Sequence, residues 1–318
     1  MPEARIRPAT ASGSPLASPS STPSGMRLIL GAARPRFLLL SPVCVSLGFA
    51  AAVADGIRLD PMVSALVLLG AISAHVSVNT LNEYLDYRSG LDFLTVRTPF
   101  SGGSGILPAH PELASAVLRL ARASLGAAAL IGFWLAWRSG AGLLPLGLAG
   151  LALIYFYTGP INRHPWLCLI APGLGFGPLM VTGSHYAVMG SYSSTALAAS
   201  LIPLFLISNL LLLNQFPDRE ADREAGRRHP LIAWGLHRCS HVYAGLLAAA
   251  YLSLILGVCL SFLPKTCLLG LATLPLALRA ARGVLRNAEN TAKLLPFMAV
   301  NVSLSLLTPA LVACGLLF

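Results

Sequence analysis

The stretch TALAASLIPLFLISNLLLLNQFPDREADRE, residues 195–224, decides the fold of this chain, because an apolar run ends there in a cluster of acids. A helix over 195–216 is long enough to cross ~30 Å of hydrocarbon at ~1.5 Å per residue. Asp218 and Asp222 follow directly after this run. Carboxylates are costly at a membrane boundary, so their concentration there indicates that they bind an ion or a charged substrate.

A second acidic cluster has the same setting. The apolar run 62–84 leads into NEYLD, residues 82–86, and Asp92 follows after Gly90. Gly90 allows the chain to turn, so that Asp92 can fold back toward the same place. Seven of the twelve Asp and Glu residues belong to the two clusters, which therefore carry most of the negative charge of the chain.

The composition indicates a membrane protein with many spans. Of the 318 residues, 55% are hydrophobic and 11% are charged, whereas about a quarter of the residues of a soluble domain are charged. The net charge of +10 is accompanied by no nucleic-acid-binding motif, so we expect no nucleic-acid partner. The six cysteines form no C-x-x-C pair, which argues against a zinc site and a disulfide framework.

We predict an all-α integral membrane protein, a bundle of about nine transmembrane helices surrounded by lipid. A tail over residues 1–25, rich in Ser, Pro and Ala and predicted to be disordered, precedes a transmembrane domain over 26–318. The predicted helices cover residues 36–54, 62–84, 114–137, 142–157, 167–189, 195–216, 240–263, 266–285 and 294–318. The first four and the next four helices each carry an acidic cluster after their second member, which indicates two four-helix pseudo-repeats.

The distribution of Lys and Arg predicts the orientation. With the N-terminus in the cytoplasm, 19 of the 22 Lys and Arg residues fall on the cytoplasmic side, and only Arg58, Arg138 and Lys265 fall outside. Such an asymmetry is typical of the positive-inside rule. Both acidic clusters then lie on one membrane face, and we expect an active site that faces the cytoplasm, with a bacterial inner membrane as the location.

The spacing within the clusters favours Mg²⁺. Asn82 and Asp86 are four residues apart, as are Asp218 and Asp222, so each pair shares one face of a helix. Mg²⁺ is typically held by one or two carboxylates, waters and substrate phosphate oxygens. The pattern therefore indicates a diphosphate that a metal ion bridges to the protein.

The arginines of the second cluster fit the same chemistry. Arg223, Arg227 and Arg228 could neutralise the remaining phosphate charge through forked hydrogen bonds. The alternative for such charges is a set of solvated salt bridges. We assign that role to Glu220 and Glu224, because they lie off the helix face of the two aspartates or beyond its end.

Both motifs resemble those of the UbiA superfamily of intramembrane prenyltransferases. NEYLDYRSGLD, residues 82–92, is similar to the N-D-Y-x-D-x-x-x-G-x-D form of the 1,4-dihydroxy-2-naphthoate, menaquinone-type branch. Residues 214–228 resemble the second Asp-rich motif, and Arg34-Pro35 and Tyr157-Thr158 look like further family features. The resemblance covers about residues 27–318.

The resemblance implies Mg²⁺-dependent transfer of a prenyl group from an isoprenyl diphosphate to an aromatic acceptor, in quinone biosynthesis of the menaquinone type. The implied metal ligands are Asn82, Asp86, Asp92, Asp218 and Asp222. The implied diphosphate-binding residues are Arg34, Arg88, Arg223, Arg227 and Arg228. Asn82, Asp86, Asp218 and Asp222 are the implied catalytic residues, with Tyr157, whose ring would stabilise the allylic cation. The family usually has Asp where this chain has Glu83, which leaves a metal contact at Glu83 open.

Several alternatives stay open. The acceptor could instead be of the 4-hydroxybenzoate, tocopherol or chlorophyll, or glycerol-lipid type, and the enzyme could be a terpene-cyclising relative. A cation-coupled transporter is the main rival from another class, although transporters usually hold ionisable groups near the bilayer midplane; a silent prenyl-lipid-binding scaffold is a third option. The Gly-rich segment 100–105 could cradle phosphate, cover the site or form a simple turn. The oligomeric state is not determined by the sequence.

Overall fold

The computed structural model describes residues 25–318, and within that range the chain forms helices and no strands. The predicted tail of residues 1–25 lies outside the described residues, except for Gly25, where the first helix begins. The all-α prediction is therefore confirmed for the described part of the chain.

The helices follow the predicted apolar segments closely. Eight of them are long and apolar enough to cross a membrane, namely Pro35–Ala54, Pro61–Ser89, Pro111–Ser139, Pro165–Met189, Ser194–Glu224, Leu236–Cys259, Lys265–Asn287 and Thr291–Leu316. The predicted segment 142–157 forms the apolar helix α8 (Leu143–Phe156). Its 14 residues extend only ~21 Å at ~1.5 Å per residue, less than the thickness of the hydrocarbon core. The count of nine spans, their orientation and the two repeats stay predictions.

The helices have the following residue ranges. The principal helices are α3 (Leu40–Ala54), α4 (Pro61–Ser89), α7 (Ala114–Ser139), α9 (Pro165–Leu174), α10 (Met180–Met189), α11 (Ser194–Glu224), α13 (Leu236–Cys259), α14 (Leu274–Asn287) and α15 (Thr291–Leu316). The short elements are α1 (Gly25–Gly31), α2 (Pro35–Leu38), α5 (Leu91–Leu94), α6 (Ile106–Ala109), η1 (Pro111–Leu113), η2 (Ile161–Arg163), η3 (Gly175–Leu179), α12 (Pro230–Trp234) and η4 (Lys265–Thr273).

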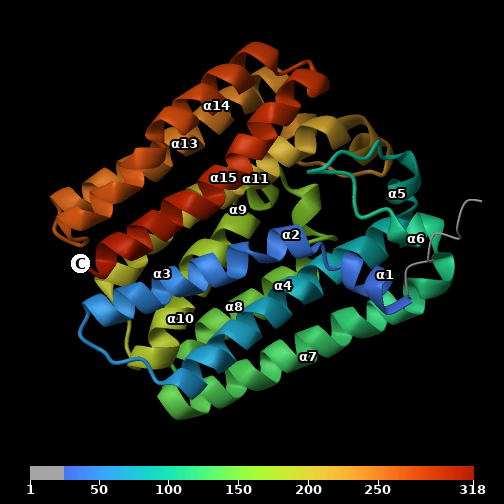
Figure 1. Ribbon diagram of the computed structural model, residues 1–318. Coiled ribbons are helices and arrows are strands. Elements are labelled where there is room, and N and C mark those ends of the chain that lie inside the picture. The colour runs from blue at the N-terminus through green and yellow to red at the C-terminus, as the bar shows by residue number, and fades with distance from the viewer. Residues whose placement is uncertain (1–24) are drawn as a thin grey trace, which may run out of the picture.

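Helix α11 is the centre of the bundle. It contacts α3, α9, α10, α13 and α15, and many of its side chains belong to the main hydrophobic core. In Figure 1, α13 and α14 lie together on one side of the molecule, and α4 packs along α7 on the other. Helix α11 therefore packs against helices on several of its sides.

Glycines allow the closest helix contact beside the cavity described below. A Cβ atom on Gly177 would lie 2.5 Å from the backbone oxygen of Ser200 and 2.7 Å from the backbone nitrogen of Leu204. A Cβ atom on Gly173 would also overlap the backbone oxygen of Leu204. Only glycine permits this approach of α9 and η3 to α11, as at small-residue interfaces between membrane helices.

Both ends of helix α4 are fixed by local interactions. The Asp60 side chain caps α4 by accepting hydrogen bonds from the backbone amides of Met62 and Val63, at 2.8 and 3.0 Å. At the other end, Gly90 has φ 82°, a left-handed conformation that glycine adopts without strain. The chain therefore turns sharply after α4 and brings Asp92, on α5, back beside it.

A polar network ties α3, α10 and α11 together at the end of the bundle opposite Asp92. The carboxylate of Asp55 lies 2.9 Å from Nε2 of the buried His185. Burial alone would raise the pKa of Asp55, but hydrogen bonds to Ser193 and His185 lower it below its usual value. The ionised form of Asp55 therefore stabilises this junction.

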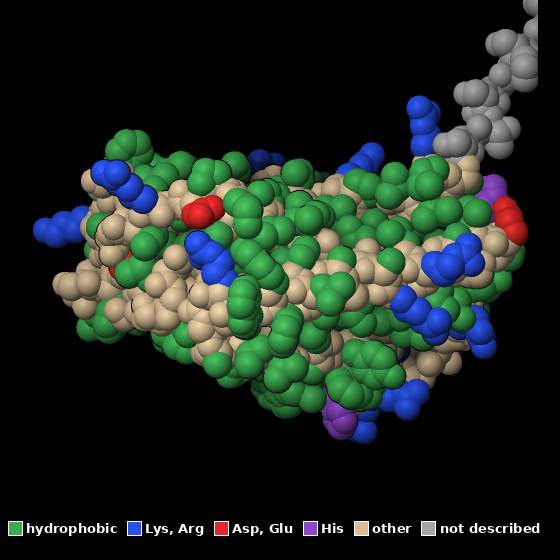
Figure 2. Space-filling view, turned by 90° about the horizontal axis from the view of Figure 1, so that it is seen from below, with side chains coloured by type: hydrophobic (Ala, Val, Ile, Leu, Met, Phe, Trp, Pro, Cys, Tyr) green, Lys and Arg blue, Asp and Glu red, His purple; other side chains and the backbone are tan. Residues whose placement is uncertain are grey.

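The surface of the bundle suits a lipid environment. Figure 2 shows a face on which hydrophobic side chains cover most of the middle, whereas Lys and Arg lie mainly toward the ends. Large apolar side chains are exposed in the structure, among them Leu130, Phe133 and Trp137 on α7. Exposed apolar surface of this extent requires hydrocarbon rather than water around it.

Candidate active site

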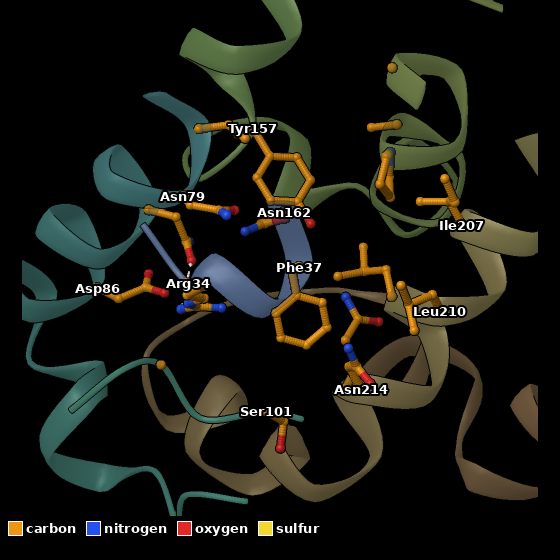
Figure 3. A pocket seen from close by; sticks show the side chains of 18 of the residues that line it. Arg34, Phe37, Asn79, Asp86, Ser101, Tyr157, Asn162, Ile207, Leu210 and Asn214 are labelled. Atoms are coloured by element: carbon orange, nitrogen blue, oxygen red, sulfur yellow. Dashed lines mark hydrogen bonds between the residues drawn. The ribbon is translucent and has the colours of Figure 1, made fainter. Parts of the chain in front are cut away.

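A cavity of about 300 Å³ lies within the bundle and has a polar end and an apolar remainder. Figure 3 shows Arg34, Asn79 and Asp86 on one side, with Ile207, Leu210 and Asn214 opposite and Tyr157 and Asn162 above. The apolar part is lined by Leu40, Val78, Leu153, Ile154, Phe176, Met180, Ile207, Leu210 and Leu211. The site can therefore accept a ligand with a charged head and an apolar body.

Helix α4 presents one polar face to the cavity. His75, Asn79, Asn82 and Asp86 all line it, at spacings of four, three and four residues, which follow one face of an α-helix. Asn82 accepts a hydrogen bond from Arg34 at 3.4 Å and donates one to Thr158 at 3.2 Å. The structure therefore places the predicted pair Asn82 and Asp86 on the cavity wall.

Helix α11 presents a face that changes from apolar to polar. Ile207 and Leu211 line the apolar part, and Asn214, Asp218 and Asp222 line the polar end. Both predicted aspartates thus face the cavity opposite α4. Residues more than 130 positions apart in the sequence, such as Asp86 and Asp218, meet at one site only because α11 crosses the middle of the fold.

Arg227 joins the two acidic clusters. Its guanidinium forms ion pairs with Asp86 and, at 2.8 Å, with Asp222. Nε2 of His229 lies 3.0 Å from the second oxygen of Asp222. Asp86 and Asp222 are only 6% and 2% exposed, and burying a carboxylate is costly unless it has a hydrogen-bonded or charged partner of this kind.

The Gly-rich segment covers the polar end of the cavity. The backbone amide of Gly102 donates to Asp218 at 3.2 Å, and that of Ser104 donates to Glu83 at 3.0 Å. Gly102 and Gly103 have φ of 83° and 73°, values that few other residues adopt without strain. Two amides of this segment therefore bind carboxylates of the protein, which favours a fastened cover over a simple flexible turn.

Glu83 lies near Asp92 but is not part of the cavity wall. Its side chain is fully buried, is absent from the cavity wall, and binds the Ser104 hydroxyl and, at 3.4 Å, Arg34. One residue along a helix rotates a side chain by ~100°, so Glu83 turns away from the face that Asn82 and Asp86 share. The metal contact that the sequence left open is therefore not favoured.

The remaining oxygens of the polar end fit a hard cation. Buried oxygens of Asp92, Asn214 and Asp218 have no hydrogen-bond partner among the described residues, and all three residues line the cavity. Burial, with the nearby carboxylates of Glu83 and Asp86, raises the pKa of Asp92 to about 7. Within residues 25–318, no three His, Cys, Asp or Glu side chains form a ready metal cage. A few unpaired oxygens beside a cavity fit Mg²⁺, because this ion keeps several waters and substrate phosphate oxygens as ligands.

Comparison with known proteins decides the family. The model of the UbiA prenyltransferase family matches residues 39–304. The chain belongs to the UbiA prenyltransferase family. This UbiA protein is therefore a prenyltransferase and an integral membrane protein.

The relatives extend over nearly the whole chain. It is 30% identical over 289 residues to a 1,4-dihydroxy-2-naphthoate octaprenyltransferase from Mycobacterium tuberculosis, covering 90% of this chain and 94% of the relative. It is 27% identical over 310 residues to a 2-carboxy-1,4-naphthoquinone phytyltransferase from Synechocystis, covering 95% and 96%. The fold is similar to a UbiA homolog from Archaeoglobus fulgidus bound to DMAPP and Mg²⁺, with TM-score 0.65 and 16% identity, covering 90% of this chain and 99% of the other.

Only two of the five predicted arginines lie at the cavity of this UbiA protein. Arg34 and Arg227 line it, whereas Arg88, Arg223 and Arg228 are exposed and are not part of its wall. Arg88 donates to the Tyr84 hydroxyl at 3.1 Å and Arg223 pairs with Glu220 at 2.8 Å. The structure therefore does not bring these three arginines to the cavity, and their diphosphate contacts stay predictions.

Arg34 is held in a special backbone conformation. Its φ of 53° and ψ of 65° are left-handed, which costs a non-glycine residue about 1 kcal/mol or more and occurs often at functional sites. Asn79 donates to the backbone oxygen of Ala33 at 2.9 Å and supports this turn. The strain places the Arg34 side chain beside Asn82, at the polar end of the cavity.

The other predicted residues are Tyr157, Glu220 and Glu224. Tyr157 lines the cavity, and Figure 3 shows its ring above the polar end; its predicted role beside the cation stays a prediction. Glu220 and Glu224 are exposed, as expected for solvated acids. His75, Asn79 and His229 also line the cavity but were not predicted. The first two were detectable from the sequence, because they continue the α4 spacing of Asn82 and Asp86 toward the N-terminus.

Proposed function

We propose that this prenyltransferase uses Mg²⁺ to transfer a prenyl group from an isoprenyl diphosphate to a 1,4-dihydroxy-2-naphthoate-type acceptor, a step of menaquinone-type quinone biosynthesis. The observation that carries the proposal is the cavity itself. Charged and polar side chains line one end of this cavity, and apolar side chains line the rest. An isoprenyl diphosphate has the same division between head and tail.

The polar end suits a diphosphate. Asn82, Asp86, Asp92, Asp218 and Asp222 would hold Mg²⁺, with the unpaired oxygens of Asp92 and Asp218 as the readiest donors. When bound, Mg²⁺ neutralises the phosphate oxygens and makes diphosphate a better leaving group. Arg34 and Arg227 bring two positive charges to the same end, where they orient the diphosphate by charge-assisted hydrogen bonds.

The apolar part suits the reacting carbon and the tail. The allylic C–O bond breaks with its electron pair leaving on the diphosphate, and a carbon of the acceptor ring forms the new C–C bond. The ring then regains aromaticity by losing the proton or carboxyl group at that carbon. Phe176, Leu210 and the other apolar side chains exclude water, which would otherwise capture the cation. The face of the Tyr157 ring offers negative potential beside it.

The relatives support the acceptor class. The names of the Mycobacterium tuberculosis and Synechocystis relatives share a naphthalene-based acceptor but differ in the prenyl group. The proposal therefore specifies a naphthalene-based acceptor but not the chain length of the prenyl donor. The cytoplasmic excess of Lys and Arg, 19 of 22 residues, supports an active site on the cytoplasmic face of a bacterial inner membrane.

The test uses the full chain in detergent micelles with Mg²⁺ and labelled prenyl diphosphates of several lengths. The acceptors are 1,4-dihydroxy-2-naphthoate, 4-hydroxybenzoate and homogentisate. We expect prenylated naphthoate and released diphosphate, both abolished by EDTA and by Asp86→Ala or Asp218→Ala.

Glu220→Ala is the matched control, because Glu220 is an exposed acid of the same cluster. It should retain full activity. A clear preference for 4-hydroxybenzoate would overturn the acceptor assignment, and absence of any prenylated product would overturn the enzyme mechanism as a whole.

A further inference from the structure

One polar side chain lies in the apolar part of the cavity. Along α4, α8 and α11, the polar lining residues are concentrated from Asn79, Tyr157 and Asn214 onward. His75 lies deeper than these on α4, between the apolar lining residues Ala74 and Val78. It is only 5% exposed, and on α4 it precedes the other titratable lining residue, Asp86, by eleven positions toward the N-terminal end.

Two neighbouring side chains, Ser41 and Phe176, hold the imidazole of His75 in place. Its Nδ1 lies 2.9 Å from the hydroxyl of Ser41. Ser41 lies on α3 and is fully buried. Phe176, in the π-helical turn η3, packs against the ring edge to face at a centroid distance of 4.8 Å and an interplanar angle of 75°. Nε2 has no partner among the described residues, so a fixed ring offers one free nitrogen to the cavity.

The position of His75 relative to the reacting carbon follows from helix geometry. His75 and Asn82 are seven residues apart on α4, which corresponds to ~10 Å along the axis. A diphosphate bound at Asn82 and Asp86 directs its allylic carbon toward the apolar part of the cavity. The group that attacks this carbon must therefore lie next to it, within reach of His75.

The isoprenoid tail and the aromatic acceptor differ in whether they can form a hydrogen bond with His75. An isoprenoid tail has no hydrogen-bonding group, so packing it against His75 would leave a buried ring nitrogen unpaired, which is unfavourable. An aromatic ring that attacks an allylic cation carries electron-donating oxygen substituents. A hydroxyl on that ring can pair with Nε2 in either tautomer of His75, and a carboxylate can accept a hydrogen bond from Nε2 when Nε2 carries the proton.

We infer that His75 is the acceptor-binding residue, whose free ring nitrogen bonds an oxygen substituent of the aromatic acceptor and so orients its nucleophilic carbon toward the allylic carbon. Ser41 is a positioning residue that holds the imidazole. This inference rests on the proposed function, because it requires an oxygenated aromatic acceptor. It assigns acceptor recognition to α3 and α4 and leaves donor recognition to the two acidic clusters.

The experiment separates acceptor from donor kinetics in the full chain with Mg²⁺. KM is measured for 1,4-dihydroxy-2-naphthoate at saturating prenyl diphosphate, and for prenyl diphosphate at saturating acceptor. For His75→Phe we expect a rise of about tenfold in acceptor KM, the size of one lost hydrogen bond at a buried site, with donor KM unchanged. His75→Gln, which can place an amide near the position of Nε2, should recover part of the loss.

Ser41→Ala and Ser77→Ala form a matched pair. Both serines are fully buried and make one side-chain hydrogen bond of 2.9 Å, Ser41 to His75 and Ser77 to the backbone oxygen of Ala121 on α7. Ser41→Ala should raise acceptor KM severalfold, and Ser77→Ala should leave it unchanged. A second readout is an acceptor with its hydroxyls methylated, which the wild type should discriminate against more strongly than His75→Phe does.

The outcomes distinguish the two proposals. Unchanged acceptor KM in His75→Phe and His75→Gln, or a rise in donor KM instead, overturns the role of His75 while the prenyltransferase function stands. If the wild type prenylates no oxygenated aromatic acceptor, the proposed function fails first and this inference with it.

Discussion

Replacing Arg227 by Ala tests how the two acidic clusters are held together. The change removes the cation that bridges Asp86 and Asp222, which are 6% and 2% exposed. Removing one partner of a buried ion pair typically costs about 3–5 kcal/mol, because the remaining charge is uncompensated. His229 still pairs with Asp222, so we expect a loss near the lower end, about 3 kcal/mol.

The assay is thermal unfolding of the full chain in detergent micelles, followed by Trp fluorescence in EDTA and in saturating Mg²⁺. At roughly 2 °C per kcal/mol for a large domain, Arg227→Ala should lower Tm in EDTA by about 6 °C. A cation bound to the same carboxylates replaces part of the lost charge. Mg²⁺ should therefore stabilise Arg227→Ala more than it stabilises the wild type.

Arg223→Ala is the control for this comparison. Arg223 is 46% exposed and pairs with Glu220, which is 65% exposed, and exposed pairs contribute little to stability. Its Tm should stay within about 1 °C of the wild type. Equal Tm values for Arg227→Ala and Arg223→Ala in EDTA would refute the bridging role, and a Tm gap that Mg²⁺ does not narrow would refute the metal site beside it.

Three further predictions concern positions outside that bridge. Glu83→Asp should leave the Mg²⁺ dependence of activity unchanged but speed proteolysis of segment 100–105, because Glu83 binds that segment rather than the cavity; a shifted Mg²⁺ requirement would contradict this. Asp55→Asn should lower Tm at pH 7, and the gap should close as the pH falls below the ordinary Asp value of 3.8, because the lowered pKa of Asp55 means that its ionised form stabilises the fold only above its pKa; a gap independent of pH would argue against an ionic contribution. Gly177→Ala should impair folding because its Cβ would overlap the backbone of α11, whereas Gly183→Ala, with no atom within 4 Å of the added Cβ, should be tolerated; equal expression of the two variants would refute the close approach.

Hydrophobic runs were sufficient to locate the helices. Long stretches such as 195–216 must be helical in lipid, because every backbone amide and carbonyl needs a partner and only a helix supplies all of them locally. The apolar run 142–157, the shortest of the predicted spans, forms the 14-residue helix α8. Helix α8 ends at Phe156, before the turn that carries Tyr157.

Helical spacing was sufficient for part of the site. Four-residue spacing placed Asn82 with Asp86, and Asp218 with Asp222, on common faces, because the angle between side chains along one helix is a local property. The same local rule could have added Asn79 and His75. It could not select among the arginines, because Arg88, Arg223 and Arg227 are all near an aspartate in the sequence, and only the packing of neighbouring elements determines which one points inward.

The sequence by itself therefore determined a helical membrane protein with two acidic motifs of the UbiA type, since hydrophobicity and helix periodicity are encoded within each segment. The tertiary structure decided which charges meet. Arg227 pairs with Asp86 across 141 positions, Glu83 binds the segment over the cavity, and His75 is directed by Ser41 and Phe176 into the apolar part. These contacts join separate helices, and their geometry depends on how α3, α4, η3 and α11 pack rather than on any single stretch of the chain.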